Sequence, residues 1–279
     1  MEEKDLHYLA VLSTRKRAIS QLDLIVEPAS EDKNDIANAE LVKTFLNREA
    51  LQDELFDMLD AIGKGFSVME IIWDTSEKQW MPKTLSYVDP RWFEFARQDR
   101  RTLYLKSDDG AKPLAPYKWI PFFAKAKSGL PIRGGLARVA AWAYLFKNFG
   151  VKSWVTFAEV YGQPLRVGKY GAGATEADKR TLLRAVANVA QDAACIIPES
   201  MLIEFVDAKT TPSADLYEKL VDHFDRQISK AVLGQTTTTD AISGGHAVSK
   251  EHNEVRWDIA KADAKQVLAV LNPSLIKPI

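Results

Sequence analysis

The sequence predicts a two-lobed α+β protein in which long helices follow a smaller lobe of mixed helices and strands. Three observations support this. Short strand-like runs alternate with helical patterns in the first half, a long and mostly apolar helix begins after residue 134, and a small α/β segment separates that helix from a second long one. The chain has 279 residues, which exceeds the usual size of one domain and favours about two lobes.

The first helix is predicted over residues 5–21 by its apolar spacing, and the alternating run Leu22–Val26 is typical of an edge strand. From Asp35 to Ile62 apolar residues recur every three to four positions, which predicts one amphipathic helix. Gly63 and Gly65 follow directly and are expected to end it.

Short strands are then predicted, each bounded by residues that favour turns. The segment Lys127–Pro131 is rich in turn-forming residues and is expected to close the first lobe at about residue 130. The predicted strands are Phe66–Trp73, Thr84–Val88, Trp92–Ala96 and Thr102–Lys106.

The segment Leu136–Val160 predicts a helix that is apolar on most sides and rich in aromatic residues between Trp142 and Phe157. Such a helix is expected to pack against several neighbours or against other subunits, and base stacking by its aromatic rings is the less favoured alternative. Gly150 lies inside it and permits a kink.

A small α/β segment follows. Its strands are expected at Gln163–Lys169, Ala194–Ile197 and Met201–Val206. Between the first two, Thr175 and Asp178 form a capping box that predicts the start of a helix.

The second long helix is predicted to open at Thr211-Pro212 and to end at Gly234. A polar loop follows over Gln235–Asp240 and Ser243–His246, and a last helix is expected over Ser249–Leu271. The apolar stripe of the second long helix has a strict four-residue spacing and consists of Leu216, Leu220, Phe224, Ile228 and Val232.

Net charge limits the kinds of partner. The chain has 37 basic and 38 acidic residues, a net charge of −1, whereas proteins that grip DNA phosphates usually have a basic excess. Any DNA contact is therefore expected to be loose or confined to one lining. The basic cluster Arg15–Arg17 offers phosphate contacts, but a solvent-exposed helix face is the favoured interpretation.

Cysteine content and hydropathy point to a reducing cytoplasm and away from membranes. The single cysteine, Cys195, lies in an apolar run and is expected to be a buried small hydrophobe rather than a nucleophile. No stretch has the length and apolar content of a membrane span, and the acidic start Met1–Asp5 does not resemble a signal peptide.

Glycines that precede the helix predicted at Thr175 raise the possibility of phosphate binding. Gly168, Gly171 and Gly173 precede the helix at Thr175, but their spacing matches neither the P-loop nor the dinucleotide pattern. A solvated turn is the favoured interpretation.

Metal and acid–base chemistry are weakly supported. His246 and His252 have Asp240 and Glu251 nearby, but no further ligand has helical spacing, so surface histidines are favoured. The carboxylate pairs Glu199 with Glu204 and Asp222 with Asp225 are expected to be solvated faces. The sequence therefore predicts a protein without catalytic residues, cofactor or metal.

Several segments, in order along the chain, resemble the portal proteins of Mu-like phages and prophages. No single motif is specific, but the ordered set is. The matching segments are Ala61–Trp73, Gly135–Arg138, Tyr144–Lys147, Trp154–Pro164, Gly168–Tyr170 and Leu233–Thr238.

The resemblance implies a portal-type fold and a ring, usually of twelve subunits, at the capsid vertex of the virion, through which double-stranded DNA enters and leaves. It implies a wing lobe over 1–130, stem helices over 131–162 and 209–234, a clip over 163–208, and a channel loop with the last helix over 235–279. Members usually extend further at both ends, so this chain is expected to be a trimmed or degenerate copy.

The implied partners are other copies of the chain, DNA bound without sequence preference, the packaging motor (terminase) and head or neck proteins, with assembly in the host cytoplasm. Other phage head, neck or adaptor proteins remain the first alternative, and a nuclease or ATPase the second. The candidate channel-lining residues are Lys230, Gln235, Thr236, Thr237, Thr238, Thr239, Asp240, Ser243 and His246. The candidate subunit-interface residues are Trp142, Phe146, Phe149, Trp154, Leu216, Leu220, Phe224 and Ile228.

Overall fold

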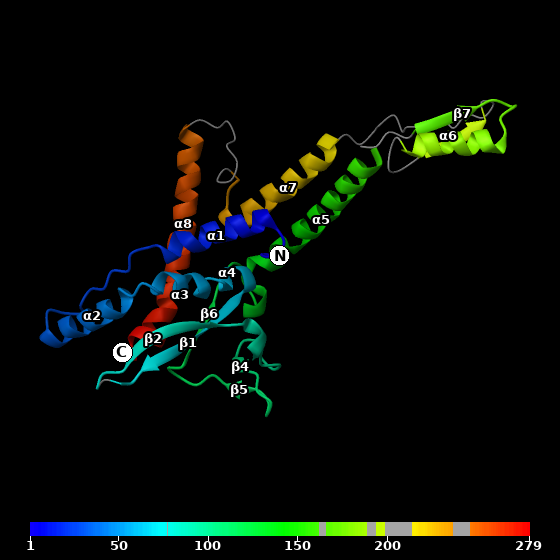
Figure 1. Cartoon of the computed structure of the whole chain (residues 1–279). Coiled ribbons are helices and arrows are strands. Elements are labelled where there is room, and N and C mark those ends of the chain that lie inside the picture. Colours follow the sequence, from blue (N-terminus) through cyan, green and yellow to red (C-terminus); the bar gives the residue numbers. More distant parts are fainter. Residues whose placement is uncertain (77, 162–165, 189–193, 199–213, 237–245) are drawn as a thin grey trace. The chain divides into compact units, whose positions relative to one another are not determined.

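A computed structural model describes residues 1–76, 78–161, 166–188, 194–198, 214–236 and 246–279 (Figure 1). The chain divides into two compact units. Unit 1 comprises Met1–Tyr144 with Asp225–Ile279, and unit 2 comprises Leu145–Phe224. The mixed helices and sheets confirm the predicted α+β class.

Helix α1 (Leu6–Ser20) begins where the sequence predicts. The Asp5 carboxylate accepts a hydrogen bond from the Tyr8 backbone N–H at 2.8 Å, which satisfies one of the free donors at the helix start. The strand predicted over Leu22–Val26 is wrong, because no described strand pairs with this segment. Its residues are alternately half-buried and exposed. The apolar–polar alternation therefore reflects packing of one side of the segment rather than pairing with another strand.

The single helix predicted over 35–62 is also wrong, since three helices occupy this region: α2 (Lys33–Leu46), α3 (Leu51–Met58) and α4 (Ala61–Lys64). Arg48 explains the first break. Its guanidinium donates to the Phe45 carbonyl oxygen at 3.1 Å and pairs with the Glu54 carboxylate at 2.5 Å, which stabilises the turn between α2 and α3. Apolar spacing continues across this turn, so periodicity alone did not reveal it.

Two small antiparallel sheets complete the first part of unit 1. The first has strand order β2-β1-β6, with β1 in the centre, and the second has order β3-β4-β5. Neither β5 nor β6 was expected, because β5 has two residues and β6 has a proline at its centre, which weakens a strand pattern. The strands are β1 (Phe66–Asp74), β2 (Met81–Val88), β3 (Phe93–Phe95), β4 (Leu103–Leu105), β5 (Lys112–Pro113) and β6 (Trp119–Phe123).

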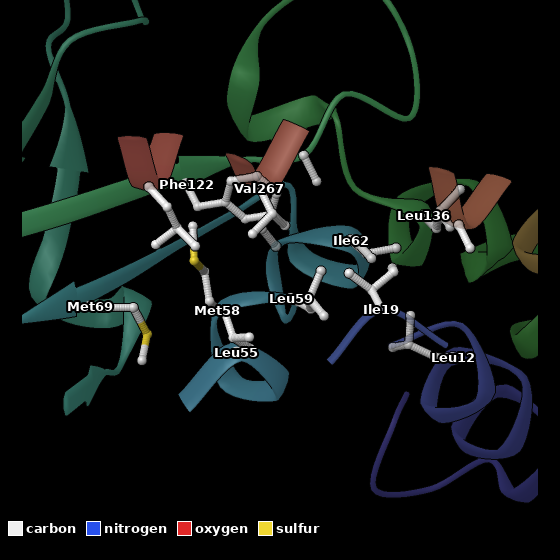
Figure 2. Packing of buried hydrophobic residues seen from close by; sticks show 14 of the residues in the cluster. Leu12, Ile19, Leu55, Met58, Leu59, Ile62, Met69, Phe122, Leu136 and Val267 are labelled. Atoms are coloured by element: carbon white, nitrogen blue, oxygen red, sulfur yellow. The ribbon is translucent and has the colours of Figure 1, made fainter. Parts of the chain in front are cut away.

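The core of unit 1 joins segments far apart in the sequence. Met58, Leu59 and Ile62 pack in one buried cluster with Phe122 of β6 and Val267 of α8 (His246–Leu271), as Figure 2 shows. The last helix of the chain is thereby packed into the same core as its first hundred residues. Helix α8 ends at Leu271 and continues into a single π-helical turn, Asn272–Ile276.

Two long helices contribute to both units: α5 (Leu136–Tyr161) and α7 (Ala214–Leu233). Their bounds agree closely with the prediction, although Thr211 and Pro212 lie outside the described residues. Gly234 has a φ of +70° and its N–H donates to the Lys230 carbonyl oxygen, which is the expected C-terminal glycine of α7.

Unit 2 also contains a small α/β element made of β7 (Arg166–Tyr170), α6 (Glu176–Asn188) and β8 (Ala194–Pro198). Strands β7 and β8 are parallel neighbours, as a helical crossover between them requires. The predicted capping box is confirmed, because Thr175 and Asp178 exchange backbone and side-chain hydrogen bonds. The strand expected at Met201–Val206 and the side chain of Cys195 lie outside what the structure describes.

Candidate functional site

Helices α5 and α7 contact each other closely within unit 2. A Cβ placed on Gly150 would lie 2.9 Å from Leu220 Cδ2, so this glycine permits a close approach. The rings of Phe146 and Phe224 stack with centroids 6.1 Å apart. Helix α5 runs without interruption from Leu136 to Tyr161, so Gly150 serves the contact rather than a break in the helix.

Helix α5 carries an apolar face that is about half exposed to solvent or more in the single chain. Val139, Trp142, Phe146 and Phe149 recur at intervals of three, four and three residues, which places them on one side of a helix. Their exposed fractions are 52%, 67%, 48% and 57%. We call these four residues the α5 stripe. Trp154 is half-buried.

The predicted stripe of α7 divides into two parts. In unit 2, Leu216 and Leu220 are exposed and Phe224 is half-buried. In unit 1, Ile228 and Val232 are 1% and 0% exposed and belong to the core of the chain itself. Ile228 was a candidate interface residue, but its side chain is already covered within one chain.

The end of α7 differs from the sequence prediction at one candidate channel residue. Lys230 is exposed and Thr236 is half-buried, but Gln235 is only 5% exposed, so its side chain is not available to a channel. A Cβ on Gly234 would lie 3.1 Å from both Val255 and Ile259 of α8, which shows how tightly this turn packs.

The remaining candidate channel residues are not placed by the structure. His246 is the first residue of α8, but its side chain is not described. The others, Thr237, Thr238, Thr239, Asp240 and Ser243, lie outside the described residues.

Arg15 fixes the root of the α7–α8 connection, a role that sequence reasoning missed. Its Nη1 donates to the Val232 carbonyl oxygen at 2.7 Å, and its Nε and Nη2 donate to the two Asp263 carboxylate oxygens at 2.7 and 3.1 Å. Only the presence of an acid, Asp263, within the predicted last helix hinted at such a partner. A charged residue of α1 thus contacts both helices that flank the polar loop.

Lys16 is also buried, with 4% of its side chain exposed. Its ammonium lies 3.8 Å from an Asp60 carboxylate oxygen and 4.0 Å from the centre of the Phe56 ring. The expectation that Arg15–Arg17 form a solvent-exposed face is therefore wrong for Arg15 and Lys16. Because their partners lie far away in the sequence, a local pattern did not show that this face is covered.

Asp60 also organises a smaller polar cluster. It accepts hydrogen bonds or ion pairs from Lys64 and from the Tyr87 hydroxyl, the latter at 2.8 Å. Burial, together with the hydrogen bond to Asp60, raises the pKa of Tyr87 to about 12. Burial alone would lower the pKa of Lys64, but its hydrogen bonds to Asp60 and Tyr87 outweigh that effect and raise it.

Neither a metal centre nor a membrane span is found in the part of the chain that the structure describes. No group of three or more His, Cys, Asp or Glu side chains there is placed to hold a metal ion. No described helix combines the length and the apolar content that crossing a membrane requires. Glu199, Glu204 and Asp240, which entered the acid–base and metal alternatives, lie outside the described residues.

Comparison with known proteins identifies the family. A family model described as the portal protein of Mu bacteriophage matches residues 1–279. Two relatives are each 37% identical to the whole chain: the Mu-like prophage FluMu protein gp29 of Haemophilus influenzae and the portal protein of Escherichia phage Mu. The chain spans 55% of the length of each relative.

Solved structures support the same fold. The chain is similar to an HK97 family phage portal protein from Corynebacterium diphtheriae, with a TM-score of 0.52 and 13% identity over 95% of this chain and 88% of that one. It is also similar to a chain of the virion of a native gene transfer agent particle, with a TM-score of 0.56 and 13% identity over 94% of this chain and 74% of that one. The solved structures show the fold, and the family model that matches the whole chain shows that it belongs to the family of Mu bacteriophage portal proteins.

Proposed function

We propose that this chain is a subunit of a portal ring at the capsid vertex, through which double-stranded DNA passes during packaging and ejection. Membership of the portal family supports this role. The observation that carries the ring itself is the α5 stripe, whose four apolar side chains are about half exposed or more in the single chain.

A head-to-tail interface between like subunits would cover this stripe. Soluble monomers rarely expose contiguous apolar patches of this kind, and burial of each such side chain contributes about 1.5 to 3 kcal/mol. Heterologous contacts close into a ring when the rotation between subunits allows it. The proposed interface comprises Trp142, Phe146, Phe149, Trp154, Leu216, Leu220 and Phe224, whereas Ile228 already lies in the core of the chain.

The connection between α7 and α8 is the proposed DNA-facing segment. Lys230 is exposed just before it, and Thr236 with residues 237–246 supplies mainly small polar side chains and glycines. Small neutral groups do not neutralise phosphates and lack the bidentate base contacts of Arg, Asn and Gln, so a duplex can move past them. The fixed roots of this segment, at Arg15 and Gly234, would hold it in place against that movement.

The finer assignments rest on the family and on the order of elements. We propose that residues 1–130 form a wing, α5 and α7 (in 131–162 and 209–234) a stem, and 163–208 a clip that meets the packaging motor or neck proteins. Residues 235–279 would supply the channel loop and the last helix. A ring of twelve, assembled in the host cytoplasm and without enzymatic activity, is the proposed state.

The test is electron microscopy of the purified protein together with mass measurement in solution. Wild-type protein is expected to form rings with a central hole, and a W142S/F149S variant is expected to remain monomeric, because it loses the two most exposed side chains of the α5 stripe. The matched control is W80S/W92S, which removes two equally exposed tryptophans elsewhere in the chain and is expected to leave rings intact. Rings that survive W142S/F149S, or that are lost in the control as well, would contradict this interface.

A further inference from the structure

The hairpin formed by β3 and β4 ends in a tip, Ala96–Thr102, that is polar apart from Ala96. Asp99 organises this tip. Its carboxylate accepts the backbone N–H groups of Arg101 and Thr102 at 2.9 and 3.1 Å and also the Thr102 hydroxyl. These hydrogen bonds, with that of the Thr102 hydroxyl the strongest, lower the pKa of Asp99 to about 2. The tip is therefore a defined turn with an ionised organising residue.

Aromatic side chains pack the hairpin against the neighbouring sheet. Phe93 and Leu103 are buried, and Phe95 packs edge-to-face on Phe66 with ring centroids 5.1 Å apart. Phe95 also lies 6.2 Å from the ring of Phe123 in β6. These ring contacts join β3, at the base of the tip, to the neighbouring sheet.

Three arginines, Arg97, Arg100 and Arg101, project from this tip and are exposed. Among the described residues, none of their guanidinium groups makes an ion pair or a hydrogen bond, whereas Arg48 is paired with Glu54. The carboxylate of Asp99, the nearest acid in sequence, is occupied by the turn. Three positive charges therefore lie within five residues without a partner in the described chain.

Arg100 has an unusual backbone conformation within this tip. Its φ is +54°, a left-handed conformation that glycine or asparagine adopts at lower cost than a long side chain does. Non-glycine residues in this conformation cluster at ligand-binding and other functional sites.

The polar and arginine-rich composition of the tip favours a nucleic acid over a protein as its partner. Interfaces with proteins depend on an apolar or aromatic centre, which residues 96–102 lack. Interfaces with DNA are polar and rich in positive charge, and the planar guanidinium matches phosphate oxygens in pairs. We propose that the β3–β4 tip binds the phosphate backbone of duplex DNA without sequence preference, at a site separate from the α7–α8 connection.

This site depends neither on ring formation nor on the channel assignment, so it can be tested on the whole chain in solution. The measurement is fluorescence anisotropy with a labelled duplex of mixed sequence, at salt concentrations from about 50 to about 200 mM. The R97Q/R100Q/R101Q variant is expected to bind at least tenfold more weakly at the lowest salt. Its plot of log affinity against log salt is expected to flatten by about 0.9 for each lost phosphate contact, close to three in total.

The matched control removes the same net charge elsewhere. K33Q/K261Q/K265Q replaces three exposed lysines and is expected to keep the wild-type salt slope. R97K/R100K/R101K is expected to keep the slope as well, because it retains all three charges. R100G is expected to lose about one unit of slope, and to melt at a higher temperature because glycine adopts the positive φ at lower cost. An unchanged slope in R97Q/R100Q/R101Q, or an equal loss in both triple glutamine variants, would overturn the proposal.

Discussion

Arg15 is the residue through which α1, α7 and α8 are joined, and its contacts are largely removed from water. The side chains of Arg15 and Asp263 are only 14% and 7% exposed. A buried ion pair adds little to stability relative to a well-packed apolar pair, but removing one partner leaves a charge without compensation. Removing one residue of the pair should therefore destabilise the protein more than replacing both residues by apolar ones.

We predict that Asp263→Ala lowers the free energy of unfolding by about 3 to 5 kcal/mol, because the Arg15 guanidinium would remain buried without its carboxylate. The double variant R15M/D263L should recover much of that loss. Urea unfolding measures both, with Glu40→Ala as the control: Glu40 pairs with Lys43 on an exposed face, where a pair is worth about 1 kcal/mol or less. Equal losses in D263A and R15M/D263L would show that the pair acts through packing alone.

Individual residues were the hardest feature to predict from the sequence. The roles of Asp178 and Gly234 were predicted, because a cap acts on residues three or four positions away. Arg15 was not, since its partner lies 248 positions along the chain. The burial of Gln235 was also missed, because a polar residue in a polar run gives no sign that it is buried.

At the scale of elements, the start of α5 depends on contact between two glycine-rich turns. One contains Gly63 and Gly65 and the other Gly134 and Gly135. A Cβ on Gly135 would lie 2.3 Å from the Gly63 carbonyl oxygen and 2.4 Å from the Gly65 nitrogen. Backbone atoms cannot yield as flexible side chains do, so only glycine fits this crossing of the chain.

Replacing Gly135 by alanine is accordingly predicted to cost about 3 kcal/mol or more, since the two turns must separate and the start of α5 moves away from the core. Thermal unfolding followed by circular dichroism measures the loss. Gly173→Ala is the control, because a Cβ there meets no atom within 4 Å, and it should change stability little. If the G135A variant had the same melting temperature as the wild type, the two turns would be shown to separate without a cost in stability.

Elements whose sequence pattern stops at a defined residue were predicted, and elements whose pattern continues or is interrupted were not. Helices α1, α5 and α7 were found within a few residues of their true bounds, because each long apolar pattern has a definite end. Helices α2 to α4 were predicted as one, since the apolar spacing continues through the turn that Arg48 stabilises. Strand β6 was missed because Pro121 occupies its centre, although a sheet edge tolerates proline there.

On the scale of the whole molecule, a net charge of −1 conceals two exposed surfaces of opposite character. The α5 stripe is apolar, and the β3–β4 tip carries three guanidinium groups that have no partner among the described residues. The sequence predicted three residues of the stripe, Trp142, Phe146 and Phe149, as candidate interface residues, together with the fold class and the family. It did not single out the tip, because three arginines become one site only when the turn at Asp99 brings them together.

These two surfaces should respond differently to salt, which provides a test on the whole chain. Burial of apolar surface does not depend on Coulomb attraction and is strengthened rather than weakened by salts such as sulfate. Binding through guanidinium and phosphate is weakened steeply as counterions accumulate. We predict that self-association, followed by sedimentation velocity, is retained or strengthened from about 50 to about 500 mM salt, while DNA affinity falls by about two orders of magnitude or more over the same range. The W142S/F149S variant should lose association and keep DNA binding, and R97Q/R100Q/R101Q should do the reverse. Association that dissolves in salt together with DNA binding would mean that charge, and not the α5 stripe, holds the subunits together.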